Sequence, residues 1–276
     1  MNLATGAWEL CIGKPPGVRA PHALQDGAGF EYIEGLDRFL LWPGIYLGYE
    51  KPGAPVLDFA RGMWWLDPQT LTYLHDTRLF GAYQSGTGCP FGGVLDKQRM
   101  HIIAFGDGAV RRWDLGKGER LPNIEFRLAR DPEATGTHYQ RTRPVMIGRS
   151  VYVLGFRSDG GKVQKPLFLR YDADTGKVVE LTPPPVGAKG MPPDIEIRLV
   201  VSHSKVVWPR THGPEGDIDG IAVYDTKADT WSVDTQVPKV GEFLCNAVCS
   251  LPDGRAVLAG GVFGKQQTHL WFYEAA

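Results

Sequence analysis

The sequence predicts an all-β chain that folds as a single β-propeller of five four-stranded blades. Two observations lead to this prediction: a short hairpin phrase recurs about every 50 residues, and each end of the chain carries one half of that phrase. Helix is expected to be nearly absent, because no segment keeps a helical period for more than two turns. A fragment of a six- or seven-bladed ring is the alternative architecture.

The phrase is clearest in residues 221–238. Its first half ends in Tyr224 and is rich in β-branched and aromatic residues, which favour an extended strand. Thr226–Asp229 has the composition of a tight turn, and Trp231 begins a second strand with alternating polarity. Pro238 ends that strand because it has no backbone N–H to donate. The phrase therefore predicts a β-hairpin.

An aromatic or apolar residue followed by Asp marks each copy of the phrase. The copies fall at Asp67, Asp114, Asp172 and Asp225, at intervals of 47, 58 and 53 residues. We expect these carboxylates to accept backbone hydrogen bonds within their own turns. The Trp residues of the phrase are expected to pack between blades, where each would bury roughly 150–250 Å².

The two ends of the chain together carry the residues of one more hairpin. Residues 270–276 match the first half of the phrase, and residues 1–8 match the second half, with Trp8 in the place of Trp231. We therefore expect a strand at residues 3–10 to pair with the last unit and close the ring.

The remaining elements follow in order along a single domain at 1–276, with strand, turn and strand signals in every unit. In the first unit we expect strands at 30–34 and 38–42 and a hairpin over 62–73; in the second, strands within 91–106 joined to the next by Asp107–Gly108. In the third unit we expect a hairpin at 143–155 and an outer pair of strands at 167–181. In the fourth unit we expect two strands within 195–208, before the hairpin described above. In the fifth unit a turn at Pro252–Gly254 separates the first two strands. The expected blades are 30–73, 80–121, 143–181, 194–237 and 243–276 together with 1–10.

Bulk composition excludes several partners and compartments. The 276 residues carry a net charge of −1, which gives no electrostatic basis for binding nucleic acid or an anionic membrane. Neither a secretory signal nor an apolar run long enough to span a bilayer is visible. The four cysteines are too few for a disulfide framework, so we expect buried free thiols, which favour a reducing cytoplasm. We also expect a monomer.

The hairpin units resemble the kelch repeat. The last unit has Gly260–Gly261, an aromatic stretch at Phe272–Tyr273 and then, at the other end of the chain, Trp8. Other units keep the aromatic–Asp step but replace the glycine pair, as at Trp208–Pro209. The resemblance implies a kelch-like propeller with an architecture similar to the central domain of galactose oxidase, and a role in binding a protein or a small ligand.

Loops at the mouth of a propeller channel are the expected binding region. Several Arg, His and Tyr residues in the predicted loops would suit a protein partner or a small polar or anionic ligand. The candidates are His22, Arg78, Tyr83, Arg141, Arg143, His212 and Glu242. The seven His residues show no metal-ligand spacing, and no cofactor motif appears, so we assign neither a metal nor a cofactor.

These observations favour a non-enzymatic binding or interaction module, and no catalytic residue is assigned. The alternative is a propeller enzyme acting on carbohydrate, which would need two carboxylic acids about 5–9.5 Å apart at the channel. Acids on or beside the predicted inner strands are Glu31, Glu34, Asp194, Glu196 and Glu242. A structural piece of a larger assembly is a third hypothesis.

Overall fold

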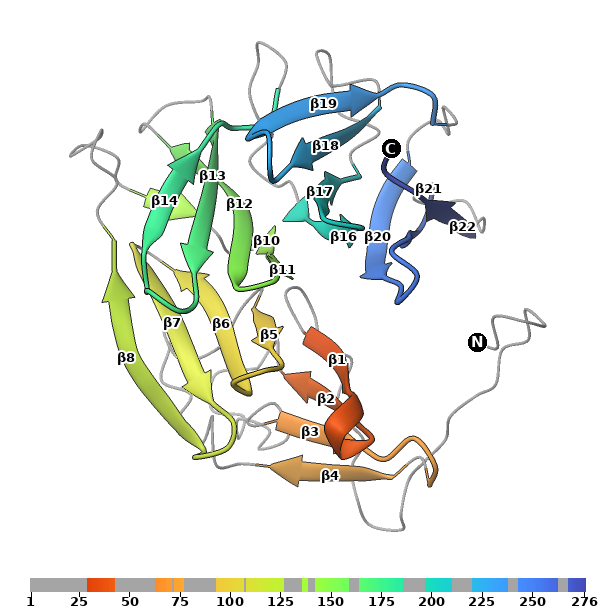
Figure 1. Ribbon diagram of the computed structural model, residues 1–276. Helices are drawn as coiled ribbons and strands as arrows, with labels where there is room; N and C mark the ends of the chain where they lie inside the picture. Colours follow the sequence, from red (N-terminus) through yellow and green to blue (C-terminus); the bar gives the residue numbers. More distant parts are fainter. Residues whose placement is uncertain are drawn as a thin grey trace, which may run out of the picture.

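A computed structural model provides the three-dimensional structure of the chain. It describes residues 29–42, 63–70, 72–76, 93–106, 108–126, 136–138, 142–158, 164–185, 197–209, 220–237, 243–262 and 268–276. The architecture is a five-bladed β-propeller: five antiparallel sheets are arranged around a common centre, each with its first strand innermost (Figure 1). The predicted fold class is confirmed.

Blades 1 and 2 are four-stranded sheets in which each strand pairs with the next along the chain. Blade 1 contains β1 (Gly29–Ile33), β2 (Arg38–Trp42), β3 (Met63–Leu66) and β4 (Tyr73–Asp76), with a single 3-10 turn at Glu34–Leu36. Blade 2 contains β5 (Val94–Asp96), β6 (His101–Gly106), β7 (Ala109–Asp114) and β8 (Glu119–Glu125).

Blades 3 and 4 repeat this order. Blade 3 contains β11 (Val145–Ile147), β12 (Ser150–Ser158), β13 (Gln164–Asp172) and β14 (Val178–Leu181), and β9 (Gly136–His138) also pairs with β12. Blade 4 contains β16 (Val200–Ser202), β17 (Lys205–Trp208), β18 (Ile221–Asp225) and β19 (Thr230–Asp234). A short parallel pair, β10 (Thr142–Arg143) with β15 (Ile197–Arg198), joins the two blades near the centre.

Blade 5 has three strands within the described residues: β20 (Phe243–Ser250), β21 (Ala256–Val262) and β22 (Thr268–Tyr273). The expected fourth strand at 3–10 lies outside the described residues. Within the same residues, no helix is long and apolar enough to cross a membrane.

The repeated aspartates close the outer hairpins, as the sequence predicts. In blade 4, an Asp225 carboxylate oxygen accepts hydrogen bonds from the backbone N–H groups of Lys227 and Ala228 at 2.9 and 3.0 Å. Asp67, Asp114 and Asp172 accept equivalent bonds in the outer turns of blades 1, 2 and 3. Each carboxylate satisfies N–H groups that the turn removes from the strand ladder.

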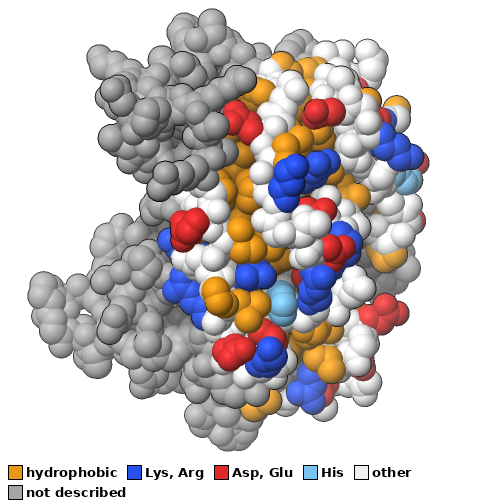
Figure 2. Space-filling model, turned by 60° about the vertical axis from the view of Figure 1, so that its left-hand side comes forward, with side chains coloured by type: hydrophobic (Ala, Val, Ile, Leu, Met, Phe, Trp, Pro, Cys, Tyr) orange, Lys and Arg blue, Asp and Glu red, His pale blue; other side chains and the backbone are white. Residues whose placement is uncertain are grey.

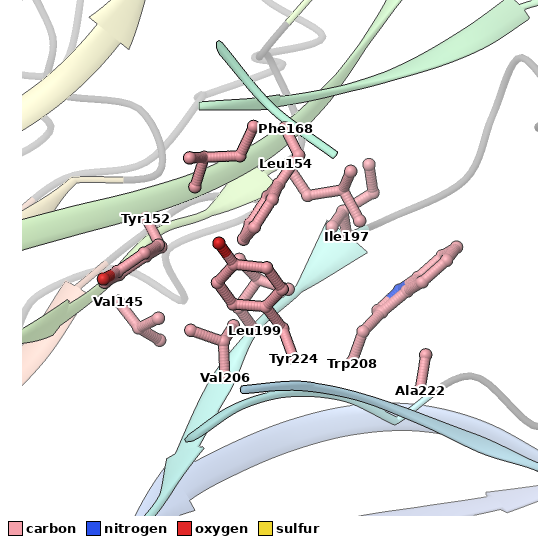
Figure 3. Packing of buried hydrophobic residues seen from close by; sticks show 11 residues of the cluster. Val145, Tyr152, Leu154, Phe168, Ile197, Leu199, Val206, Trp208, Ala222 and Tyr224 are labelled. Atoms are coloured by element: carbon pink, nitrogen blue, oxygen red, sulfur yellow. The ribbon is translucent and has the colours of Figure 1, made fainter. Parts of the chain in front are cut away.

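Buried apolar clusters lie between neighbouring blades rather than within them, because alternate residues of each strand face opposite neighbours. Between blades 3 and 4, Phe168 is fully buried and its ring meets Tyr224 edge to face at 4.8 Å (Figure 3). Trp231 packs on Phe168 at 5.0 Å and donates its indole N–H to the Thr182 carbonyl at 2.8 Å. Equivalent clusters join blade 1 to 2, blade 2 to 3 and blade 4 to 5.

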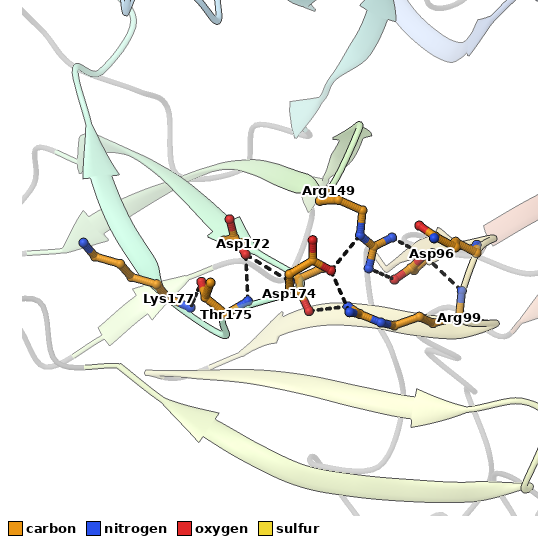
Figure 4. A network of polar contacts seen from close by, with 9 residues as sticks. Asp96, Arg99, Arg149, Asp172, Asp174, Thr175 and Lys177 are labelled. Carbon is orange, nitrogen blue, oxygen red and sulfur yellow. Dashed lines mark hydrogen bonds and ion pairs between the residues drawn. The ribbon is translucent and has the colours of Figure 1, made fainter.

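A polar contact reinforces the seam between blades 2 and 3. Arg149 donates both Nη groups to the two oxygens of the buried Asp96 carboxylate at 2.8 Å, and its Nε to Asp174 at 3.0 Å (Figure 4). Arg99 adds bonds to Asp174 at 2.6 Å and to the Ala173 carbonyl. Bidentate pairing of this kind is the strongest that a guanidinium and a carboxylate form.

Candidate functional site

A cavity of about 440 Å³ lies among the innermost strands of all five blades. Residues of β1, β5, β11, β16 and β20, with β10 and the first turns of blades 2 and 3, form its lining. This volume is in the range of small-molecule sites. We call this space the channel cavity.

The backbone around Arg143 is fixed by a break in the inner strand of blade 3. Pro144 has no N–H and cannot continue the ladder, so the strand divides there into β10 and β11. The β10 part pairs in parallel with β15, which sets Arg143 opposite Arg198, and Leu199 donates its N–H to the Arg143 carbonyl at 3.2 Å. Arg143 is therefore anchored on two blades before its side chain enters the channel cavity.

The Arg143 guanidinium reaches from blade 3 toward blades 1 and 5. Its Nη2 lies 3.9 Å from a Glu31 carboxylate oxygen, and its Nη1 donates to the Val248 carbonyl at 3.4 Å. Burial lowers the pKa of Arg143, Glu31 opposes this effect, and the neighbouring Arg198 lowers the pKa further. Because a guanidinium stays charged well above neutral pH, Arg143 holds a positive charge with long, incomplete contacts.

Lys97 and Glu31 extend this charged group across the cavity. Lys97, in the first turn of blade 2, places its Nζ 3.6 Å from the second Glu31 oxygen. The Glu31 side chain is 30% exposed and thus lies between two cations with part of its surface open. Ion pairs this long and this exposed contribute little to stability, so the group is better suited to exchange partners than to hold the fold.

The other charges in the lining cancel each other. Gly148 has a φ of 58°, in the left-handed region that favours glycine, which allows a two-residue turn that presents Arg149 to Asp96. Burial acts to raise the pKa of Asp96, but hydrogen bonds from Arg149 and from the Arg99 and Gln98 backbone outweigh it, and the pKa is lowered. Asp96 therefore remains ionised and paired with Arg149.

Cys249 and Ser250 of β20 complete the lining on the side of blade 5. Ser250 accepts a hydrogen bond from the Val201 N–H at 3.1 Å and so links blades 4 and 5. Cys249 is a free and exposed thiol, and the expectation that it is buried is wrong. Partial desolvation of the sulfur at the cavity wall raises the pKa of Cys249, against the opposing effect of Arg143.

The structure places one of the seven candidate ligand-binding residues, Arg143, in the lining of the cavity. The other six lie outside the described residues: His22, Arg78, Tyr83, Arg141, His212 and Glu242. Among the candidate acids, Glu31 lines the cavity and Glu34 is exposed in the 3-10 turn, whereas Asp194, Glu196 and Glu242 lie outside the described residues.

Sequence reasoning missed Lys97, Arg149 and Cys249. All three lie on inner strands or their first turns, whereas the basic candidates predicted from the sequence lie in loops. The usable signal was their position in or next to the predicted turn of an inner hairpin, because the first turns of blades 2 and 3 belong to the cavity lining.

On the side shown in Figure 2, acidic and basic side chains alternate around short apolar stretches, and no large patch of one sign forms. Within the described residues, no cluster of His, Cys, Asp and Glu is suited to hold a metal ion. We therefore take the channel cavity, which all five blades line, as the candidate site.

Comparisons with known proteins give structural likeness without sequence relatives. No protein-family model and no curated protein matches the sequence. Hydrazine synthase from Kuenenia stuttgartiensis superposes over 89% of this chain and 71% of its own, with a TM-score of 0.52 and 11% identity. TolB from Acinetobacter baumannii matches over 77% of this chain and 46% of its own, with a TM-score of 0.44 and 16% identity.

A third solved structure, the extracellular domain of a one-component system from B. thetaiotaomicron, matches over 87% of this chain and 26% of its own, with a TM-score of 0.42 and 10% identity. At such identities the superposition on hydrazine synthase concerns the fold alone and says nothing of what the cavity binds.

Proposed function

We propose that this chain is a non-enzymatic binding module of the kelch-like propeller type that takes a small polar anion in its channel cavity. The observation that carries the proposal is Arg143, a charged guanidinium in the cavity lining whose contacts are a 3.9 Å ion pair and a 3.4 Å hydrogen bond. A ligand carboxylate or phosphate would give it two short, parallel hydrogen bonds in place of these.

The charge around Arg143 supports this choice of ligand. Lys97, Arg143 and Arg149 are the basic side chains of the described lining, and Glu31 and Asp96 are the acidic ones. Since Arg149 and Asp96 neutralise each other, Lys97 and Arg143 outweigh Glu31. A cavity with low-dielectric walls and one excess positive charge favours an anion.

A carbohydrate-cleaving enzyme is less well supported by the same residues. Hydrolysis needs two carboxyl groups with different tasks, one of them able to donate a proton. Of the two acids in the described lining, Asp96 is held ionised by Arg149, which leaves Glu31 alone for chemistry.

The test is binding of a panel of small anions to the full chain by isothermal titration calorimetry, with a neutral analogue for each. We expect at least one anion to bind in preference to its neutral analogue, and about tenfold weaker binding by Arg143→Gln. Arg120→Gln is the matched control, because Arg120 is an outer-strand arginine that bonds Asn123 and stacks on Trp113.

Circular dichroism and the urea midpoint establish that each variant is folded, and Arg143→Lys keeps the charge if Arg143→Gln does not fold. Absence of any anion binding, or equal affinities in wild type and both Arg143 variants, would overturn the proposal.

A further inference from the structure

An aromatic platform borders the channel cavity on blade 1. The Phe30 ring stacks on the Phe39 ring at 4.8 Å with an interplanar angle of 2°, and Phe39 also contacts Tyr32 at 5.0 Å. Phe30 is nevertheless 49% exposed, and it is part of the cavity lining. One side of the ring is thus covered by Phe39, while much of the rest is available to a flat apolar surface.

The platform lies next to Glu31, the acidic member of the charged group, on strand β1. Phe30 and Glu31 are consecutive in β1 and project from opposite faces of the sheet, yet both line the cavity because β1 is the innermost strand. A molecule in the cavity would therefore meet an aromatic ring, a carboxylate and the two cations that flank the carboxylate, Lys97 and Arg143.

These groups require three properties of one ligand. The aromatic ring calls for a face of C–H groups or an aromatic face. The cations call for an anionic group, and the single excess positive charge of the lining matches a monoanion better than a phosphate monoester. Glu31 repels the anionic group but accepts hydrogen bonds from hydroxyls, so the ligand must carry hydroxyls as well.

We infer that the ligand is a monoanionic sugar acid of the hexuronate type. Its ring packs its C–H face on Phe30, its carboxylate binds Arg143 and Lys97, and its hydroxyls donate to Glu31. This inference rests on the proposed anion-binding function and adds the chemical class of the anion. Benzoate would leave Glu31 unsatisfied, and a nucleoside monophosphate brings about two negative charges.

The experiment is calorimetric titration of the full chain with glucuronate, glucose, benzoate and adenosine monophosphate. Wild type is expected to bind glucuronate about tenfold more tightly than any of the other three. Phe30→Leu should weaken glucuronate binding about fivefold or more, because it removes the stacking surface and keeps an apolar side chain. Phe272→Leu is the matched control, an aromatic of similar exposure on β22 that is absent from the cavity lining.

Glu31→Gln separates the sugar acid from other anions. The variant loses an acceptor for hydroxyls and also frees Arg143 from its competing carboxylate. We therefore expect weaker binding of glucuronate and stronger binding of benzoate by this one variant, whereas a site that reads charge alone would bind both more strongly.

The outcomes distinguish the two proposals. Preference for benzoate or adenosine monophosphate, still dependent on Arg143, would overturn the sugar-acid inference and leave the anion-binding function standing. Undiminished glucuronate binding by Phe30→Leu would also overturn the inference. Failure of every anion to bind would overturn both.

Discussion

Two seams of the ring, between blades 3 and 4 and between blades 5 and 1, are built from similar strands but differ in how far their apolar side chains are buried. In the first, Phe168 and Tyr224 meet in a buried cluster, and Trp231 bonds the neighbouring blade. At the second, large apolar side chains on both flanks are exposed, among them Phe30 at 49% and Phe272 at 49%. No buried cluster spans that seam within the described residues.

All exposed large hydrophobic residues of the described chain belong to blades 1 and 5: Phe30, Tyr32, Leu36, Leu74, Leu270 and Phe272. The alternation of each strand supplies an apolar face to both neighbours, and in blades 2, 3 and 4 both faces are covered. Packing between blades, rather than the sequence of each strand, therefore sets which of these side chains are exposed, and Phe30, which lines the cavity, stays uncovered.

The largest expected effect comes from the closed seam. Phe168→Ala removes a fully buried ring that contacts Tyr152, Tyr224 and Trp231. We expect the free energy of unfolding to fall by about 3–5 kcal/mol, as measured by urea denaturation. A loss below about 1 kcal/mol would show that this seam does not hold the ring together.

A smaller loss is expected at the seam between blades 2 and 3, where a polar contact supplements the apolar one. Asp96→Asn leaves Arg149 without its bidentate carboxylate partner and should cost about 2–3 kcal/mol at neutral pH. Because the folded-state pKa of Asp96 is lowered, the carboxylate stabilises the protein above its unfolded pKa of about 3.9, and this stabilisation is lost as the pH falls through the folded pKa.

Unfolding curves of wild type and Asp96→Asn should therefore differ most near pH 7 and converge below about pH 4. A constant difference across this range would contradict the role given to the Asp96 charge.

The smallest effect is expected at the open seam. Phe272→Ala removes an aromatic residue that is 49% exposed and stacks with Arg255 at 5.2 Å. Its cost should stay below about 1 kcal/mol in the same urea assay. A loss as large as that of Phe168→Ala would mean that this seam is covered in solution, and the contrast between the two seams would then fail.

The sequence was sufficient for the fold because its signals are local. The aromatic–Asp step places Asp67, Asp114, Asp172 and Asp225 in outer turns, and a hairpin needs only neighbouring residues to form. The partners across a seam, such as Trp231 and Thr182, follow once the blades are known to pack side by side.

The site was only partly predictable. Glu31 could be proposed from its place on an inner strand, and Arg143 from a loop that leads into one, but their meeting with Lys97 and Cys249 depends on the curvature of the five-bladed ring. The error over Cys249 has the same origin: in an apolar strand a thiol is normally buried, yet the innermost strand of a propeller borders the channel.

The most direct test of the account needs no knowledge of the ligand. Cys249 lines the cavity with Arg143, so its alkylation by anionic iodoacetate, relative to neutral iodoacetamide, measures the positive potential there. The two rates are measured on the Cys249 peptide by mass spectrometry, and their ratio cancels changes in thiol reactivity. We predict that Arg143→Gln lowers the ratio about threefold to tenfold and that Arg120→Gln leaves it unchanged. An equal ratio in wild type and Arg143→Gln would contradict an anion-attracting channel.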